Sequence, residues 1–182
     1  QWIGPCRNLL LQRGDSSAEW SRAWKVGLWA RLHEGDHANA VLKGYFRDAS
    51  NIQFFGNHGF PIQVDGPLGV AGAIGEMLVQ SNEGYIEWLP ALPAEWNEGA
   101  VDGLCARGAF RLDGRWSGGR MKEARILSQQ GNVCRIYTGA HGTPGSLSRV
   151  TLNGKHIPLK QLPGGIVEFP TQKGNLYTLQ FN

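Results

Sequence analysis

The sequence has little of several features that would each point to a particular class of protein. Charged residues make up only 18% of its 182 residues, and the formal net charge is +3. No run of basic residues alternates with aromatic ones, so nucleic acid is not a predicted partner. No apolar stretch approaches the roughly 20 residues of a membrane-spanning helix, so no membrane partner is predicted either. The first ten residues, QWIGPCRNLL, lack the charged and then apolar segments of a signal peptide.

Cysteine is also scarce, and no cysteine pair has the spacing of a metal site. The three cysteines are Cys6, Cys105 and Cys134. They are predicted to be buried free thiols, which leaves the cellular compartment open. The segment HEGDH (33–37) matches the zinc pattern H-E-x-x-H, which requires both histidines on one face of a continuous helix. Gly35 and Asp36 fall between two amphipathic patterns, where a turn is expected, so neither a metal nor a cofactor is predicted.

Glycine and tryptophan are abundant instead, with 26 and 7 residues, which is typical of a turn-rich and aromatic-rich enzyme or sugar-binding protein. Up to about residue 85, apolar residues recur at helical spacing and predict helices over about 18–33, 36–47 and 68–82. Ser16 and Glu19 have the spacing of a capping box at the start of the first helix. The connection to the second helix is so short that the two should form an antiparallel αα-hairpin.

From about residue 100 onward, apolar and polar residues alternate with the period of β-strands. Asn153–Gly154 is a strong hairpin signal, and several short strands with regular turns indicate an antiparallel β-sandwich. The proline-rich segment LPALPAEWNEG (89–99) joins the two halves. The predicted fold class is therefore α+β, with a helical domain over 1–90 and a β-sandwich domain over 91–182.

Asp65 lies in the stretch PIQVDGPLG (61–69), where a helix is expected to begin. In a structural interpretation, Pro67 takes the first helical position, where its missing N–H costs nothing, and Asp65 or Gly66 caps the helix. In the other interpretation, the carboxylate takes part in chemistry. The residues alone favour the cap, because capping aspartates far outnumber catalytic ones.

Three long segments carry a resemblance to a known family. They read RGDSSAEWSRAWKVGLWARLHEGDHA, PIQVDGPLGVAGAIGEMLVQS and YIEWLPALPAEWNEGAVDGLCARGAFRLDGRW. Together, and in this order, they resemble the C-terminal part of glycoside hydrolase family 95, which contains inverting α-L-fucosidases and some α-L-galactosidases. The resemblance implies the last helices of an (α/α)6 catalytic barrel, incomplete in this chain, followed by a C-terminal β domain. The chain is therefore expected to be a fragment of an enzyme.

The resemblance also implies a catalytic role for Asp65, which matches the family's motif aspartate. In the family this aspartate activates an asparagine side chain, which acts as the base toward water, while a separate glutamate protonates the leaving oxygen. An inverting enzyme holds base and acid far enough apart to admit that water. The asparagine, the glutamate and an Arg-His sugar-binding motif belong to the upstream chain. Catalysis then becomes the favoured role of Asp65, and this role is compatible with capping of the helix.

Trp20, Arg13 and His58 are the candidate substrate-binding residues. Trp20 could stack on a sugar face or belong to the barrel core. Arg13 could line the pocket or pair with a carboxylate. The family's histidine lies six residues before the aspartate, where this chain has Gly59, and His58 is its neighbour.

The chain also departs from the family's motifs. Pro67 and Leu68 follow Asp65–Gly66 where the family continues with Asn-Phe, and Ala18-Glu19-Trp20-Ser21 stands in place of Thr-Gly-Trp-Ser. These departures leave the sugar specificity open. Glu76, in the third expected helix, is predicted to be a hydrogen-bonded structural group and not the catalytic acid.

The resemblance thus predicts part of an inverting glycoside hydrolase that removes terminal α-L-fucose from glycans and is inactive alone. Its expected partners are a fucosylated oligosaccharide or glycoconjugate and the upstream part of the same enzyme, and the resemblance implies an extracellular or periplasmic location. The alternative is a non-catalytic carbohydrate-binding β-sandwich module. In that case Trp88, Trp96 and Trp116 would form an aromatic platform.

Overall fold

The computed structural model describes residues 3–49, 64–139 and 146–182. The chain divides into two compact units, the first comprising residues 1–78 with 91–93 and the second residues 79–90 with 94–182. Helices make up the first unit and antiparallel sheets the second, so the fold is a mixture of α and β structure. Within the described ranges, none of the helices is long and apolar enough to cross a membrane.

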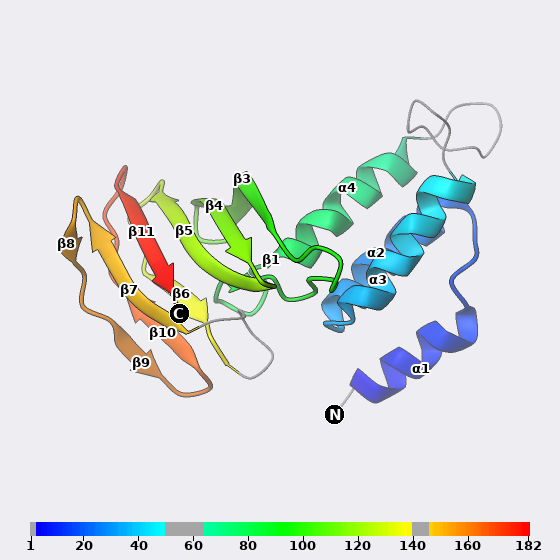
Figure 1. Ribbon diagram of the computed structural model, residues 1–182, viewed down its shortest axis with the longest axis horizontal. Helices are drawn as coiled ribbons and strands as arrows, with labels where there is room; N and C mark the ends of the chain where they lie inside the picture. Colours follow the sequence, from blue (N-terminus) through cyan, green and yellow to red (C-terminus); the bar gives the residue numbers. More distant parts are fainter. Residues whose placement is uncertain (1–2, 50–63, 140–145) are drawn as a thin grey trace. The chain divides into compact units, whose positions relative to one another are not determined.

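The described residues of the first unit form four α-helices and a short π-helical turn (Figure 1). They are α1 (Ile3–Arg13), α2 (Glu19–Arg31), α3 (Gly35–Gly44), the π-helical turn (Tyr45–Ala49) and α4 (Asp65–Leu78). The three helices predicted from apolar spacing are present. The third ends earlier than predicted, because strand β1 begins at Val79. Helix α1 was not predicted, and Arg7 on it pairs with Glu34 at 2.7 Å.

The α2–α3 hairpin is confirmed, but its turn lies two residues earlier than predicted. Helix α2 ends at Arg31, His33 adopts a positive φ of 61°, and α3 already begins at Gly35. A Cβ on Gly35 would lie 2.6 Å from the Ala91 carbonyl oxygen, so this close approach requires glycine. The break in the helix places the two histidines of HEGDH on separate elements.

The capping box predicted at Ser16 and Glu19 is wrong. Ala18 occupies the N-cap position of α2 and makes no side-chain hydrogen bond there. Glu19 is the first residue of the helix, and only 2% of its surface is exposed. The Ser16 hydroxyl instead accepts a hydrogen bond from the Arg22 guanidinium at 3.4 Å.

Small residues bring α2 and α4 close together. A Cβ on Gly69 would lie 3.2 Å from the Cβ of Ala23, and a Cβ on Gly27 would lie 3.8 Å from that of Ala73. The buried core of this unit includes Val26, Trp29 and Ala30 of α2, Val41 and Leu42 of α3, and Val70 and Met77 of α4. Apolar burial of this kind is the main source of stability for such short helices.

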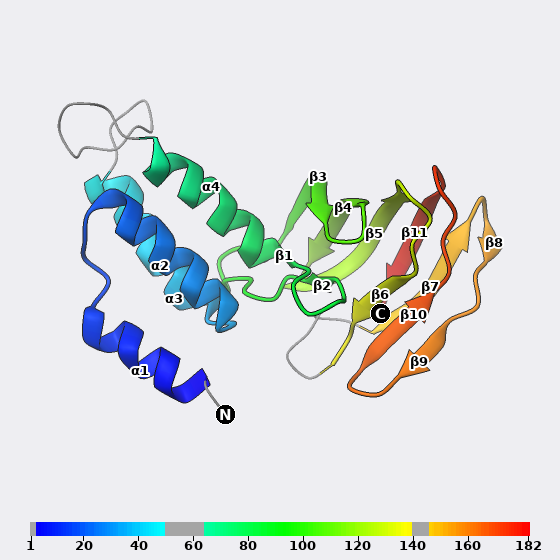
Figure 2. The same cartoon turned by 180° about the vertical axis from the view of Figure 1, so that it is seen from behind.

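In the second unit, the residues that the structure describes form three antiparallel sheets (Figure 2). Their strands are β1 (Val79–Gln80), β2 (Glu87–Trp88), β3 (Gly99–Ala106), β4 (Phe110–Ser117), β5 (Arg120–Ser128), β6 (Cys134–Tyr137), β7 (Leu147–Leu152), β8 (Lys155–His156), β9 (Lys160–Leu162), β10 (Ile166–Phe169) and β11 (Leu176–Phe181). The largest sheet has the order β3-β4-β5-β11-β7-β8, the second β6-β10-β9, and β1 pairs with β2.

The core of the second unit lies where the two larger sheets meet. Buried and more exposed residues alternate along β10 and β11, and the ring of Phe169 on β10 contacts that of Tyr177 on β11, with centroids 5.8 Å apart. The predicted hairpin at Asn153–Gly154 is confirmed. Both residues have positive φ, 50° and 77°, as a tight turn between β7 and β8 requires.

The tryptophan platform expected of a carbohydrate-binding module is not formed. Trp88 is fully buried against Gly114, where an added Cβ would lie 2.6 Å from its ring. Trp116 is 7% exposed, and its indole N–H donates to the Trp96 carbonyl oxygen at 2.7 Å. Because two of the three rings belong to the core, the alternative based on this platform is wrong.

Candidate functional site

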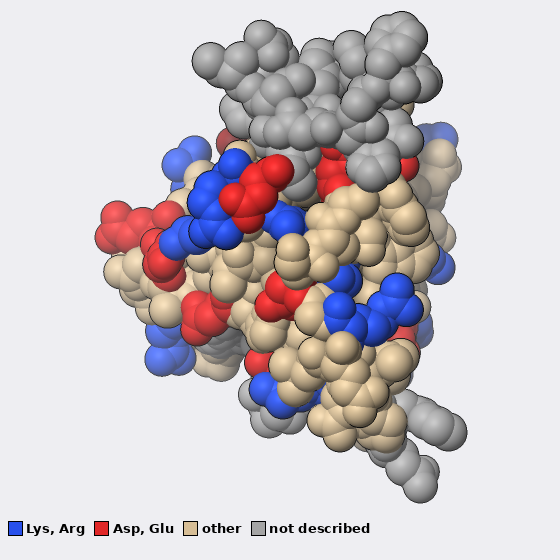
Figure 3. Space-filling model, turned by 90° about the vertical axis from the view of Figure 1, so that its right-hand side faces the viewer, with Lys and Arg blue, Asp and Glu red and all other residues tan. Residues whose placement is uncertain are grey.

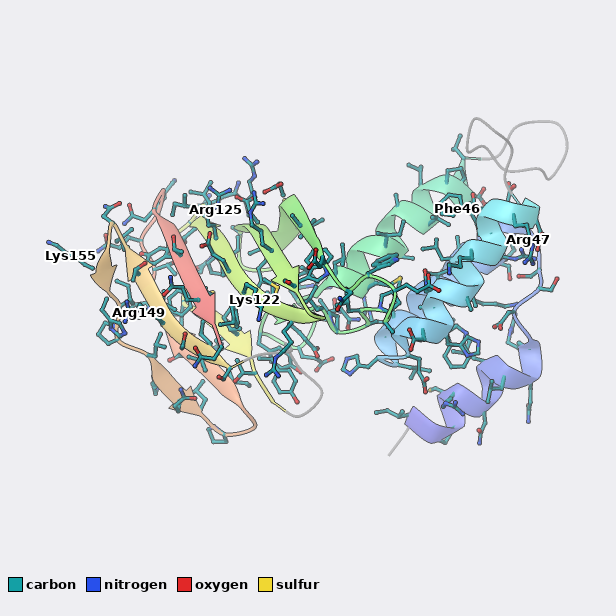
Figure 4. The ribbon with its side chains drawn as sticks, viewed as in Figure 1. Phe46, Arg47, Lys122, Arg125, Arg149 and Lys155 are labelled. Atoms are coloured by element: carbon teal, nitrogen blue, oxygen red, sulfur yellow. The ribbon has the colours of Figure 1, made fainter. Side chains whose placement is uncertain are left out.

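Three helix ends meet at one end of the first unit. The N-terminal ends of α2 and α4 lie there together with the C-terminal end of α3 (Figure 1). A Cβ on Gly66 of α4 would lie 3.0 Å from the Tyr45 hydroxyl oxygen and 3.1 Å from Cγ of Glu19. Phe46 and Arg47, labelled in Figure 4, follow Tyr45 at the same end. This meeting point positions Asp65.

Asp65 is the first residue of α4 and is exposed. Its Oδ1 accepts the Gly66 N–H at 3.1 Å, and the first helical bond runs from the Leu68 N–H to the Val64 carbonyl oxygen, also at 3.1 Å. Pro67 is the third helical residue, so the prediction that it occupies the first position is wrong. Val64, whose carbonyl oxygen accepts that bond, is the N-cap residue, so the prediction that Asp65 or Gly66 holds this position is wrong. The Asp65 carboxylate still satisfies one free N–H of the first turn, and its negative charge lies at the favourable end of the helix dipole.

An open groove of about 520 Å³ runs between α2 and α4. Its lining is mostly apolar and comprises Trp20, Ala23, Trp24, Gly27, Leu28, Arg31, Asp65, Gly69, Ala73 and Glu76. Trp20 and Trp24 are 50% and 65% exposed. The Arg31 guanidinium donates to both carboxylate oxygens of Glu76, at 2.5 and 2.8 Å. Glu76 is thus the hydrogen-bonded structural group that was predicted.

The other predicted substrate-binding residues are only partly brought together. Trp20 lines the Asp65 groove and also a second groove of about 270 Å³ between α1 and α2, which includes Arg13. Arg13 and Asp65 therefore line different grooves, which share Trp20, Trp24 and Leu28. His58 lies outside the described residues.

Figure 3 shows a face of the molecule on which acidic and basic side chains are scattered among uncharged ones.

A charged network lies beside the site. The buried Arg22 guanidinium donates to the Gly44 carbonyl oxygen and, at 3.2 Å, to Asp48. Arg47 also donates to Asp48, at 2.6 and 2.7 Å. These hydrogen bonds lower the pKa of Asp48 to about 2, and the one from Arg47 has the largest effect. Burial lowers the pKa of Lys25, whose ammonium donates to a serine hydroxyl at 3.2 Å.

The histidines of HEGDH have structural surroundings. His37 Nε2 lies 2.9 Å from Asp15 Oδ2, and its ring stacks on Trp29 with centroids 3.9 Å apart. His33 lies in the turn between α2 and α3. The described part of the chain holds no group of three or more His, Cys, Asp or Glu side chains that could bind a metal ion. All three cysteines are free thiols, but only Cys134 is buried, so the prediction of burial is wrong for Cys6 and Cys105.

Glu19 and Tyr45 are two residues of the site that sequence reasoning missed. They are 2% and 1% exposed, and both Glu19 carboxylate oxygens and the Tyr45 hydroxyl lack a hydrogen-bond partner among the described residues. Burial raises the pKa of Tyr45, and the charges of Glu19 and Asp65 raise it further. In the sequence, Glu19 stands out only as a capping-box residue and as a departure from the family's Thr-Gly-Trp-Ser motif.

Comparisons with known families divide the chain at nearly the same place as its structure does. Residues 1–78 match the glycosyl hydrolase family 95 catalytic domain, and residues 80–179 match the glycoside hydrolase family 95 C-terminal domain. The boundary between the two matches falls where α4 ends and β1 begins.

Curated relatives give the same picture. Alpha-L-fucosidase 2 of Arabidopsis thaliana is 38% identical over 143 residues, which is 71% of this chain and 17% of that protein. Probable alpha-fucosidase A of Aspergillus niger is 29% identical over 121 residues, 57% of this chain and 15% of that protein. The protein of the same name from Aspergillus oryzae is 28% identical over 144 residues, 68% of this chain and 20% of that protein. The chain therefore spans at most about a fifth of the length of these relatives.

Proposed function

Because this chain belongs to glycoside hydrolase family 95, we propose that it is the C-terminal part of an enzyme that removes terminal α-L-fucose from glycans with inversion. The first unit then supplies the last helices of an (α/α)6 catalytic barrel, and the second is a C-terminal β-sandwich domain. Two observations support this: the names of the relatives, and the small share of their length that the chain spans.

The position of Asp65 carries the proposal. Its exposed carboxylate lies at the N-terminus of α4 and lines a groove with the half-exposed ring of Trp20. Aromatic rings beside a few placed polar groups are typical of ligand sites. Among the described residues, Oδ1 accepts the Gly66 N–H, which leaves Oδ2 to accept an amide N–H from the upstream part of the enzyme.

The chemistry follows from that hydrogen bond. A carboxylate that accepts an amide N–H raises the negative charge on the amide oxygen, which then takes a proton from the attacking water. Asp65 thereby acts through an asparagine that this chain does not contain. The acid that protonates the leaving oxygen, on the opposite side of the sugar, also belongs to the upstream part.

Without that upstream part, the chain should be inactive and prone to associate. Large apolar side chains are exposed on its helices, and they include Ile3, Leu9, Leu11, Trp20, Trp24 and Leu68. An exposed apolar surface of this kind favours self-association. Purified 182-residue chain should release no nitrophenol from nitrophenyl α-L-fucoside and should show concentration-dependent association in sedimentation experiments.

The proposal is tested with the full-length enzyme. Incubation with nitrophenyl α-L-fucoside should release fucose, and proton NMR of the first product should show the β anomer, as inversion requires. Nitrophenyl α-L-galactoside serves as the matched substrate for sugar specificity. Initial formation of α-L-fucose would refute inversion, and no hydrolysis of either glycoside would refute the assigned activity.

A further inference from the structure

Tyr45 and Glu19 lie directly behind the first turn of α4. The Gly66 Cα leaves room for both, since an added Cβ would lie 3.0 Å from the Tyr45 hydroxyl oxygen and 3.3 Å from the Glu19 Cβ. Any larger residue at position 66 would separate the pair from the helix that begins with Asp65. The close approach therefore places a buried phenol and a buried carboxyl group against the terminus that holds Asp65.

These polar groups are costly to bury. Native proteins pair the large majority of buried polar side-chain atoms, and an unpaired one calls for an explanation. The described residues offer no hydrogen-bond partner to either Glu19 oxygen or to the Tyr45 hydroxyl. The Nη atoms of Arg22, one helical turn from Glu19, are bonded to Ser16, Gly44 and Asp48, and its Nε, also buried, makes no hydrogen bond to Glu19. Packing alone would be served as well by a phenylalanine at position 45.

The Tyr45 hydroxyl has two carboxyl groups near it. Burial raises the pKa of Tyr45, and the negative charges of Glu19 and Asp65 raise it further, so the hydroxyl keeps its proton at neutral pH. A protonated hydroxyl is a donor, and an ionised carboxylate is an acceptor only. Glu19 and Asp65 are therefore close enough to act on the Tyr45 hydroxyl by charge, although neither accepts a hydrogen bond from it in this structure.

We propose that Tyr45 is a positioning residue for Asp65. In the complete active site, the Tyr45 hydroxyl donates a hydrogen bond to the Asp65 carboxylate and orients it toward the catalytic amide. The inference rests on the proposed function, because the amide belongs to the upstream part of the enzyme. Glu19 lies against Gly66 as the Tyr45 hydroxyl does, and its negative charge adds to the burial that raises the pKa of Tyr45. No covalent step is involved, since the proton stays on Tyr45.

The test compares two buried tyrosines in the full-length enzyme. Tyr45→Phe should lower kcat on nitrophenyl fucoside about ten- to hundredfold, the range for a hydrogen bond to a charged group, with KM nearly unchanged. Its melting temperature should fall only slightly, because the Asp65 carboxylate is exposed and can accept a hydrogen bond from water once the hydroxyl is removed. Tyr177→Phe is the matched control: Tyr177 is equally buried, but its hydroxyl accepts the Gln172 N–H at 2.9 Å. That variant should melt earlier and keep its kcat.

A double variant tests whether Tyr45 acts through Asp65. If it does, Tyr45→Phe combined with Asp65→Asn should have the kcat of Asp65→Asn alone. Multiplied losses, or a Tyr45→Phe variant that loses stability but no kcat, would overturn the positioning role. If instead Asp65→Asn alone has no effect, the catalytic assignment of Asp65 itself fails, so the two failures are distinguishable.

Discussion

Asp65→Asn separates the capping role of Asp65 from a catalytic one. The two side chains are nearly the same size, and either can satisfy a free N–H of the first helical turn. Oδ1 of Asp65 accepts the Gly66 N–H at 3.1 Å, and an amide oxygen can accept the same hydrogen bond. The stability at risk is therefore the interaction between the negative charge and the helix dipole, about 0.3–1 kcal/mol.

The expected catalytic loss is larger. The substitution replaces an anionic acceptor by a neutral one at the moment when positive charge develops on the catalytic amide. Loss of general-base assistance should lower kcat at least about a hundredfold, which corresponds to about 2.7 kcal/mol of transition-state stabilisation. Since this exceeds the expected loss of folding stability several-fold, kinetics and melting should separate clearly.

The assay measures kcat and melting temperature of the full-length enzyme on one aryl fucoside, with Asp113→Asn as the matched control. Asp113 on β4 also accepts a backbone N–H, that of Gly103 at 2.9 Å, and pairs with Arg125 at 3.2 Å. The control should lose at most about 1 kcal/mol of stability and no activity. If Asp65→Asn keeps the wild-type kcat, the catalytic argument is refuted and Asp65 is only a cap.

Three further predictions concern stability and reactivity. Gly35→Ala should lower the free energy of unfolding in urea by more than about 1 kcal/mol, because its Cβ would lie 2.6 Å from the Ala91 carbonyl oxygen. Gly75→Ala, with no described atom within 4 Å of the added Cβ, should instead raise the free energy of unfolding by up to about 1 kcal/mol. Equal effects of the two substitutions would contradict the close packing of Gly35 against Ala91. Burial raises the pKa of Glu87 from 4.5 to about 7, so stability present below pH 4.5 should be lost as the pH rises through 7. The melting temperature of Glu87→Gln should not depend on pH in this way. If it changes with pH as steeply as that of the wild type, the prediction is wrong. Peptide mapping after iodoacetamide should find Cys134 modified only in the unfolded protein, because burial shields this thiol and raises its pKa; modification of the native protein there would contradict its burial.

The helices could be located from the sequence, but their ends could not. The buried faces of α2, α3 and α4 recur at helical spacing, and this spacing is visible without the structure. Helix α1 buries only Leu10, so it has no apolar periodicity to detect. The turn before α3 was placed too late because it depends on the contact of Gly35 with Ala91, and no local pattern signals a contact so far along the chain.

The candidate site was predictable only in part, for a similar reason. The resemblance identified Asp65 and Trp20, and both line the same groove. Glu19 and Tyr45 meet only because α2 and α3 are antiparallel neighbours that bring the start of one beside the end of the other. Their burial without hydrogen-bond partners is a property of the folded structure, so propensity and spacing could not predict it.

Residues 91–93 have a consequence for how this chain can be divided. They follow the first strands of the second unit but belong to the first: the Ala91 N–H donates to the Met77 carbonyl oxygen at 3.2 Å, and its own carbonyl oxygen faces Gly35. A truncation between the two family domains would therefore remove residues 91–93, which support the helices of the first unit. Recombination that exchanges the C-terminal domain must also exchange a surface on which Gly35 packs, so the two domains are expected to be inherited as a matched pair.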